Sequence, residues 1–242
     1  MIGVTRDGHV TVIELRRPEK RNAINVATIK ELTTAFENVA NDEETRAVVL
    51  TGQGTSFCAG ADLSDADPVE GPKAQLKLLR LIEETAVPVI AAINGPAVGA
   101  GVQLTLVCDL RVVDKDAFIQ VPTGKIGVVY DPKSIRRLVD LVGAGATRTL
   151  LYTAEKLTAE QTLHYGFANK IGDLDAALEL ARHVASLAPL SLKLTKKILR
   201  EDFDRPVPEE LWKEAEALLF SEDVREALVA RFEKRQPVFK GK

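Results

Sequence analysis

Apolar positions alternate with polar ones at the start of the chain and then take up a helical period. Ile2–Thr5 and His9–Leu15 are β-rich and alternate, and Asp7-Gly8 between them predicts the turn of a β-hairpin. The segment Val26–Ala40 is predicted to be a helix. Its apolar residues fall on one helical face: Ile29, Leu32, Phe36 and Val39.

Short apolar segments and helical segments alternate over the next 70 residues or so. Three segments read as buried strands: Ala47–Leu50, Val87–Ile93 and Leu110–Val113. Lys73–Thr85 has helical spacing, and the glycine-rich stretch Gly95–Gly101 leads into a further helix. Strands that alternate with helices are typical of an α/β fold with crossover connections.

From about residue 145 the pattern predicts helices almost exclusively. Thr158 with Gln161 fits a capping box, and Pro206 and Pro208 bracket a linker. The helical segments expected here are Ala176–Leu187, Leu190–Leu199 and Pro208–Phe232. We therefore expect an α/β core over residues 1–190 and a helical region over residues 191–242, which is either a small domain or an oligomerisation arm.

Composition excludes several classes of protein. The 242 residues include 32 Lys and Arg against 35 Asp and Glu, a net charge of -3 that argues against a nucleic-acid partner. The longest apolar run, Ala86–Ile93, is too short to span a bilayer, and the first ten residues lack the features of a signal peptide. Two cysteines are too few for a disulfide framework, and the three scattered histidines do not suggest a metal site. We expect a cytoplasmic protein.

Two loops have the small residues that let a ligand approach the backbone. Ser56–Leu63 follows the strand at Ala47–Leu50, and Asn94–Leu104 follows the strand at Val87–Ile93. Glycine-rich turns at helix starts present free N–H groups to negatively charged oxygens. Taken singly, each loop is equally well explained as a tight turn between two elements.

Taken together, the loops carry a family resemblance. They recur 39 residues apart, from Ala61 to Ala100, and short matching segments accompany them along the whole chain. These segments are Arg17-Pro18, Arg21-Asn22-Ala23, Cys108-Asp109, Leu157-Thr158-Ala159, Gly166–Lys170 and Phe232–Phe239. The chain resembles the crotonase (enoyl-CoA hydratase/isomerase) superfamily. The resemblance implies a crotonase-type ββα spiral core with a helical C-terminal trimerisation region, and assembly as a homotrimer or a dimer of trimers.

The resemblance also implies a binding site for a CoA thioester, with no separate cofactor. In the family two backbone N–H groups hold the thioester oxygen, and the matching positions here are Ala61 and Ala100. The loop residues implied to line the CoA side of the site are Ala61, Asp62, Leu63 and Ser64. Lys234 matches a position that helps to hold CoA, often from a neighbouring subunit, although it is equally well explained as a solvated helix charge.

Two side chains depart from the family pattern. Hydratases carry a catalytic glutamate at each of the positions occupied here by Gln103 and Thr123. Adding water to an enoyl group needs a base for the water and an acid for the α-carbon. An amide cannot take up a proton at neutral pH, and a threonine hydroxyl is a poor acid or base. We therefore expect little hydratase activity.

A carboxylate at another position leaves a second interpretation open. Asp131 follows Gly127 by four residues, where dienoyl-CoA isomerases of the superfamily carry a catalytic aspartate. Asp131 also fits the N-terminal turn of a helix that begins near Ser134. The alternative to a binding protein is thus an active enoyl-CoA hydratase, or an enoyl/dienoyl-CoA isomerase that uses Asp131.

Three positions together point to one branch of the family. Gln103, Thr123 and Asp131, with the segment Ser134–Leu138, resemble a glutamate-lacking actinobacterial branch that binds long acyl-CoA in fatty-acid and mycolic-acid precursor supply. The expected ligand is therefore fatty acyl-CoA. A third interpretation is a non-catalytic subunit that is recruited by fatty-acid synthesis enzymes.

Overall fold

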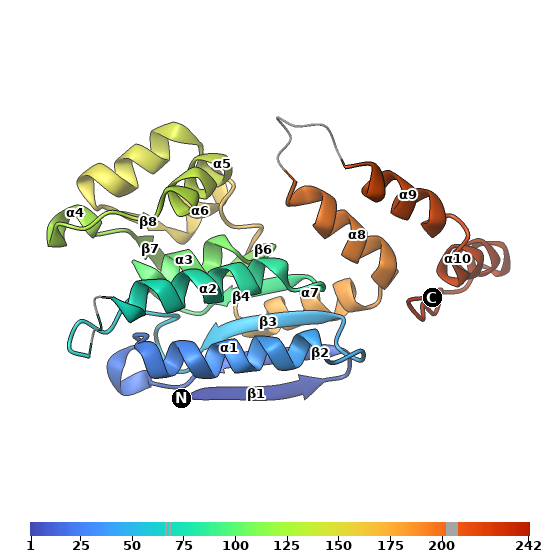
Figure 1. The fold of residues 1–242 in the computed structure, drawn as a ribbon, viewed down its shortest axis with the longest axis horizontal. Helices are drawn as coiled ribbons and strands as arrows, with labels where there is room; N and C mark the ends of the chain where they lie inside the picture. The colour runs from blue at the N-terminus through green and yellow to red at the C-terminus, as the bar shows by residue number, and fades with distance from the viewer. Residues whose placement is uncertain (66, 68, 202–207) are drawn as a thin grey trace.

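A six-stranded sheet forms the centre of the molecule (Figure 1). The computed structural model describes residues 1–65, 67, 69–201 and 208–242, so Pro206 of the expected linker lies outside the described residues. The sheet has the order β1-β2-β3-β4-β6-β9 and is parallel except for the β1–β2 hairpin. Its strands are β1 (Ile2–Asp7), β2 (Val10–Leu15), β3 (Ala47–Gly52), β4 (Val89–Ile93), β6 (Leu110–Val113) and β9 (Lys170–Ile171).

A smaller three-stranded sheet lies beside the first one. It has the order β5-β7-β8 and consists of β5 (Ala97–Val98), β7 (Phe118–Gln120) and β8 (Lys156–Thr158). The helices are α1 (Val26–Ala40), α2 (Glu70–Glu84), α3 (Ala100–Leu106), α4 (Thr123–Ile126), α5 (Pro132–Arg148), α6 (Ala159–His164), α7 (Leu174–Ala185), α8 (Pro189–Leu199), α9 (Glu209–Leu218) and α10 (Glu222–Glu233). A short 3-10 helix, η1 (Pro18–Lys20), and a π-helix, η2 (Thr149–Thr153), complete the described elements.

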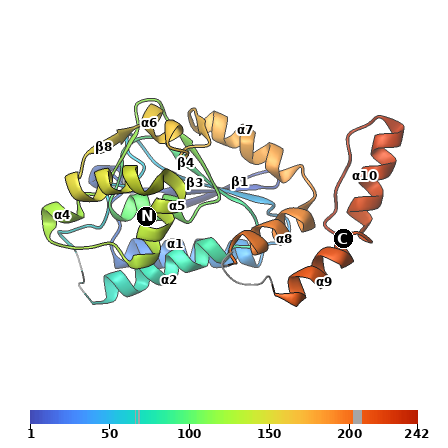
Figure 2. The same ribbon diagram turned by 90° about the horizontal axis from the view of Figure 1, so that it is seen from above.

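Helices cover both faces of the central strands of the large sheet, so that β3 and β4 are fully buried, whereas the edge strand β1 is partly exposed. The helices α1 and α2 lie on one side and α7 lies on the other (Figure 2). Alternate residues of β3 therefore enter different cores: Val48 and Leu50 pack with α1 and α2, whereas Ala47 and Val49 pack with α7. This is why the strand reads as a continuous apolar run.

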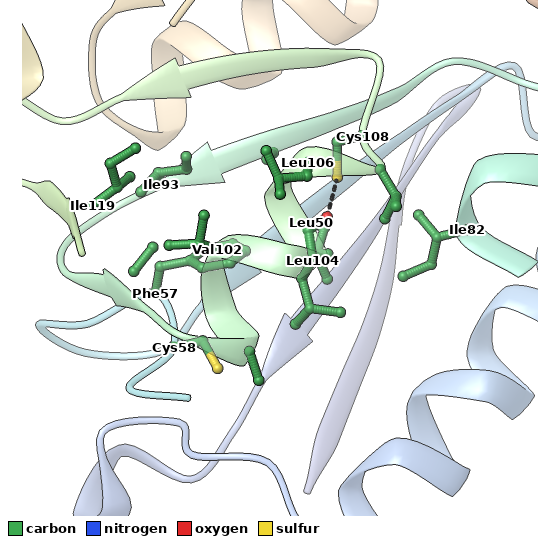
Figure 3. Close-up of a cluster of buried hydrophobic side chains, with 14 of the residues drawn as sticks. Leu50, Phe57, Cys58, Ile82, Ile93, Val102, Leu104, Leu106, Cys108 and Ile119 are labelled. Carbon is green, nitrogen blue, oxygen red and sulfur yellow. Dashed lines mark hydrogen bonds between the residues drawn. The ribbon is translucent and has the colours of Figure 1, made fainter. Parts of the chain in front are cut away.

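The short helix α3 is enclosed by the first of these cores. All seven of its residues are buried. Figure 3 shows Val102 and Leu104 of α3 among the side chains of Leu50, Phe57 and Ile82. The start of α3, which includes Ala100, is therefore held rigidly by apolar packing.

Most of the predicted elements are present, with several corrections. The hairpin turn falls on Gly8 and His9, because Asp7 still pairs with Val10. Two short strands, β8 and β9, interrupt the part of the chain that we expected to be almost exclusively helical. The single segment expected at Pro208–Phe232 is two helices, because the Ser221 side chain accepts a hydrogen bond from the Val224 N–H and starts α10 anew.

The predicted α/β class and helical C-terminal region are both observed. Figures 1 and 2 show α9 and α10 projecting from the end of the molecule that is opposite α4. The predicted boundary at residue 190 stays a prediction, and α8 spans it. No helix among the described residues is long and apolar enough to cross a membrane.

Gly101 gives a test of the packing around α3. A Cβ atom at this position would lie 2.4 Å from the Cys58 carbonyl oxygen, whereas a Cβ atom at Gly145 in α5 would meet nothing within 4 Å. We expect Gly101→Ala to reduce the free energy of unfolding by about 3 kcal/mol through overpacking. Gly145→Ala should leave stability unchanged or raise it by up to about 1 kcal/mol. Urea unfolding of both variants measures the difference, and equal stabilities would contradict the close approach.

Candidate functional site

The two predicted loops lie side by side and pair like strands. The Cys58 N–H donates to the Pro96 carbonyl at 3.2 Å, and the Val98 N–H donates to the Cys58 carbonyl at 2.9 Å. These bonds form a parallel bridge between Cys58 and Ala97. Two segments that follow neighbouring parallel strands, β3 and β4, are thereby joined at the carboxyl edge of the sheet.

A third segment holds the first loop from its other side. The Ile24 N–H donates to the Gly60 carbonyl, and the Asp62 N–H donates to the Ile24 carbonyl, each at 2.8 Å. A buried ion pair joins Arg17 to Asp62 at 2.9 Å. The Ser64 hydroxyl also donates to Asp62, and hydrogen bonds from Ser64 and then Arg17 lower the pKa of Asp62 to about 2.

The four residues predicted to line the CoA side of the site, Ala61 to Ser64, differ in their exposure. Asp62 is buried with its carboxylate turned toward Arg17 and Ser64, and its backbone N–H and carbonyl bond Ile24 and Asp65. Ala61, Leu63 and Ser64 are exposed. The role of these residues in binding CoA stays a prediction.

The two predicted N–H donors are both free in the part of the chain that the structure describes. Neither the Ala61 N–H nor the Ala100 N–H donates to a protein acceptor there. Gly60, next to Ala61, lies against the loop that carries Ala100. It has φ +102°, and a Cβ atom on it would lie 3.0 Å from the Val98 carbonyl oxygen and 3.7 Å from the Ala100 nitrogen. Residue 60 must therefore be glycine for the two loops to come this close.

Gln103 lies one turn along α3 from Ala100 and is buried in a chain of hydrogen bonds. Its side-chain oxygen accepts from the Gln75 amide of α2 at 2.6 Å. Its own NH₂ group donates to Asp131 Oδ2 at 2.9 Å and to Ser134 Oγ at 3.3 Å. Both of its N–H donors are thus engaged. The sequence contained no signal for Gln75, because this partner is 28 residues away.

Asp131 is the N-cap of α5, which agrees with its interpretation as a residue of the N-terminal turn of a helix. Its Oδ1 accepts from the Ser134 N–H at 3.0 Å, while Oδ2 accepts from Gln103. Partial burial alone would raise the pKa of Asp131, but hydrogen bonds from Ser134 and Gln103 outweigh it and lower the pKa. The carboxylate is therefore held in its ionised form.

The other predicted residues are not joined to this group. Thr123 is buried at the first position of α4, and among the described residues no hydrogen bond links its side chain to Gln103 or Asp131. Lys234 directly follows α10, which Figure 1 places far from α3 within one chain. A cavity of about 650 Å³ between α8, α9 and the end of α2 contains none of the predicted site residues.

Neither a metal nor a reactive thiol is indicated at this site. The described residues contain no group of three or more His, Cys, Asp or Glu side chains arranged to hold a metal ion. Cys58 lies next to the loop contact but is fully buried, and burial raises the pKa of its thiol to about 12. What the site offers is a pair of free backbone donors beside a fixed polar chain.

Comparison with known proteins gives the family of this fold and site. The family model for enoyl-CoA hydratase/isomerase matches residues 5–242. A Mycobacterium tuberculosis protein named "Probable enoyl-CoA hydratase echA6" is 50% identical over 246 residues that cover all of both chains. The short-chain-enoyl-CoA hydratase of Clostridium acetobutylicum is 34% identical, over 96% of this chain and 94% of that protein.

A solved structure agrees with these relatives in fold. The enoyl-CoA hydratase/carnithine racemase of Magnetospirillum magneticum superimposes with a TM-score of 0.93 at 31% identity, over 100% of this chain and 96% of that one. The match thus covers this chain from the large sheet to the C-terminal helices. The chain therefore belongs to the enoyl-CoA hydratase/isomerase family and has the crotonase fold.

Proposed function

We propose that this protein binds fatty acyl-CoA thioesters through the N–H groups of Ala61 and Ala100 and has little or no hydratase activity. The observation that carries the proposal is the coexistence of two free backbone donors with replaced acid and base positions. We further propose that the chain belongs to the glutamate-lacking branch of its family and serves fatty-acid or mycolic-acid metabolism. Its 50% identity with mycobacterial relatives supports this placement.

The free amide groups support the binding half of the proposal. A thioester carbonyl that sits between two fixed N–H groups gains hydrogen bonds without any side-chain reorganisation. Main-chain donors are unaffected by substitution at residues 61 and 100, provided that the backbone keeps its path. Gly60 and the Cys58–Ala97 bridge hold that path.

The hydrogen-bonded side chains of Gln75, Gln103, Asp131 and Ser134 support the proposal of low hydratase activity. A general base must have a free lone pair and a pKa near the working pH. Gln103 carries no proton-accepting nitrogen, and its NH₂ group is occupied by Asp131 and Ser134. The hydroxyl of Thr123 is a poor substitute for a carboxyl group. Loss of one acid or base group typically costs about 10²–10⁴ in rate.

The C-terminal helices support a proposed assembly as a trimer or a dimer of trimers. Large apolar side chains are exposed on α9, on α10 and between them: Trp212, Leu219, Phe220, Leu228 and Phe232. Such a surface is expected to be covered by another chain. In that assembly Lys234 would reach the CoA of a neighbouring subunit rather than that of its own. A fatty-acid synthesis enzyme is a further proposed partner.

The second candidate function is isomerisation or hydration that uses Asp131. It is favoured by one observation, the ionised carboxylate one hydrogen bond away from Gln103. Against it, the same carboxylate caps α5, so protonating it would weaken that cap. The two functions make opposite predictions about turnover.

Turnover of trans-2-decenoyl-CoA tests the main proposal. We expect saturable binding by calorimetry but a hydration rate at least about 10² below that of the Clostridium acetobutylicum hydratase, because both carboxyl groups are missing. Loss of the conjugated-thioester absorbance measures the rate. A rate near that of the control enzyme would refute the low-turnover half, and no binding would refute the proposal as a whole.

Asp131→Asn in the same assays separates the two functions. Asparagine preserves the helix cap, so folding and thioester affinity should stay near those of the unmodified protein. If 3-enoyl-CoA or dienoyl-CoA isomerisation is observed and is lost in this variant with unchanged affinity, the enzyme is an isomerase. Isomerisation that persists in the variant would exclude Asp131 as its base.

The hydrogen bond from Gln103 to Asp131 gives a separate test of the site. In Gln103→Glu two carboxylates would face each other in place of a donor and an acceptor. Their repulsion raises the pKa of the introduced carboxyl group in the folded state above its unfolded value. The stability loss is thus absent below about pH 4 and grows as the pH rises, reaching about 1–3 kcal/mol at pH 7.

Urea unfolding of Gln103→Glu at pH 4 and pH 7 measures this loss. The matched control is the double variant Gln103→Glu/Asp131→Asn, in which the introduced amide donates to the introduced carboxylate and still caps α5. We expect the double variant to recover most of the stability at pH 7. If Gln103→Glu is as stable as the unmodified protein at both pH values, the Gln103 NH₂ group does not donate to Asp131 as assigned.

A further inference from the structure

The peptide group between Gly99 and Ala100 has an additional hydrogen-bond partner. Its N–H is the free donor of Ala100, and its carbonyl oxygen accepts from the Tyr130 hydroxyl at 2.5 Å. The same oxygen also accepts from the N–H groups of Val102 at 2.9 Å and Gln103 at 3.2 Å. Tyr130 is thus the side-chain donor on the carbonyl side of the peptide whose amide side faces the proposed ligand.

Three donors together fix the orientation of this peptide, and Tyr130 is the side chain among them. Gly99 has φ +52° and ψ −118°, the conformation of the first central residue of a type II′ turn. A flip of the following peptide plane would give a type I′ turn, which needs a positive φ at Ala100, and it would break the bonds that the Gly99 carbonyl accepts from Tyr130, Val102 and Gln103. After such a flip the Ala100 N–H would point away from its present direction.

Tyr130 is itself held firmly on all sides. It is 5% exposed and belongs to the main apolar core. The next residue, Asp131, is fixed by the α5 cap and by Gln103. Burial raises the pKa of the phenol, so its hydroxyl keeps the proton that it donates.

We propose that Tyr130 is a positioning residue for the thioester site, whose hydroxyl orients and polarises the Gly99–Ala100 peptide so that the Ala100 N–H binds the thioester oxygen more strongly. This inference rests on the proposed function. A donor on the carbonyl of a peptide withdraws electron density from it and strengthens hydrogen bonds made by its N–H, by about 10–30%. Tyr130 never contacts the ligand in this role.

The carbonyl stretching frequency of bound [1-¹³C]decanoyl-CoA tests the proposal. In the unmodified protein we expect the band to move to lower frequency on binding, because two N–H groups polarise the carbonyl. In Tyr130→Phe the shift should be clearly smaller and the affinity up to about 2-fold lower, because one donor is weakened but not lost. A role in packing alone would leave the band of the ligand that remains bound unchanged.

Tyr152→Phe is the matched control, since Tyr152 is 81% exposed and its loss should change neither the shift nor the affinity. If Tyr130→Phe binds with the full shift, the proposal is overturned. If the unmodified protein binds no decanoyl-CoA, or binds it without a shift, the proposed function fails instead. The two failures are therefore distinguishable.

A second measurement covers the case in which Tyr130→Phe does not fold. The chain has three tyrosines, so 3-fluorotyrosine can be placed at residue 130 alone in a Tyr152→Phe/Tyr165→Phe background. The fluorinated phenol is more acidic and donates more strongly, so the carbonyl band should move further to lower frequency than with tyrosine in the same background. An unchanged band would overturn the proposal.

Discussion

The site depends on backbone hydrogen bonds among three segments that are distant in sequence. The Cys58–Ala97 bridge joins the loops after β3 and β4, and the Ile24–Ala61 bridge fixes the first loop from its other side. Both depend on close approach: Gly60 passes the Val98 carbonyl, and Gly101 passes the Cys58 carbonyl. The free N–H groups of Ala61 and Ala100 are a consequence of this pairing. Ala61 lies between Gly60 and Asp62, the two residues that bond Ile24, and Ala100 directly follows Gly99, whose N–H bonds the Gln120 carbonyl.

A binding device made of main-chain atoms places few demands on the side chains around it. The family fold and the two loops are present here with Gln103 and Thr123 at the positions where the family resemblance predicts carboxyl groups. The buried space beside α3 still has to satisfy its polar atoms. Gln75, Gln103, Asp131 and Ser134 do so among themselves, and the chain of bonds also ties α2 and α5 to α3. Gln103 is thus part of a satisfied hydrogen-bond network.

Local patterns predicted the elements whose causes are local. The helix Val26–Ala40 was predicted at its observed bounds, because its apolar face and its Asn25 cap lie within or next to the segment. The capping box of Thr158 and Gln161 was found for the same reason. The short strands β8 and β9 were missed, since two or three residues carry no period and their pairing is set by distant strands. For the site, the family resemblance located the two loops, while the roles of Gln75 and Tyr130 came only from tertiary contacts 28 and 31 residues distant in sequence.

The titratable groups around the two loops share a property that bears on function. Hydrogen bonds hold the pKa of Asp62 at about 2 and lower that of Asp131, whereas burial raises the pKa of Cys58 to about 12 and that of Tyr130 above its usual range. Acid–base catalysts are instead adjusted toward the working pH, because a group must both lose and regain its proton in each cycle. These four groups keep one protonation state throughout the neutral range. A site of this kind presents constant charge and constant donors to the proposed thioester ligand, which suits retention of an acyl chain better than proton transfer to it.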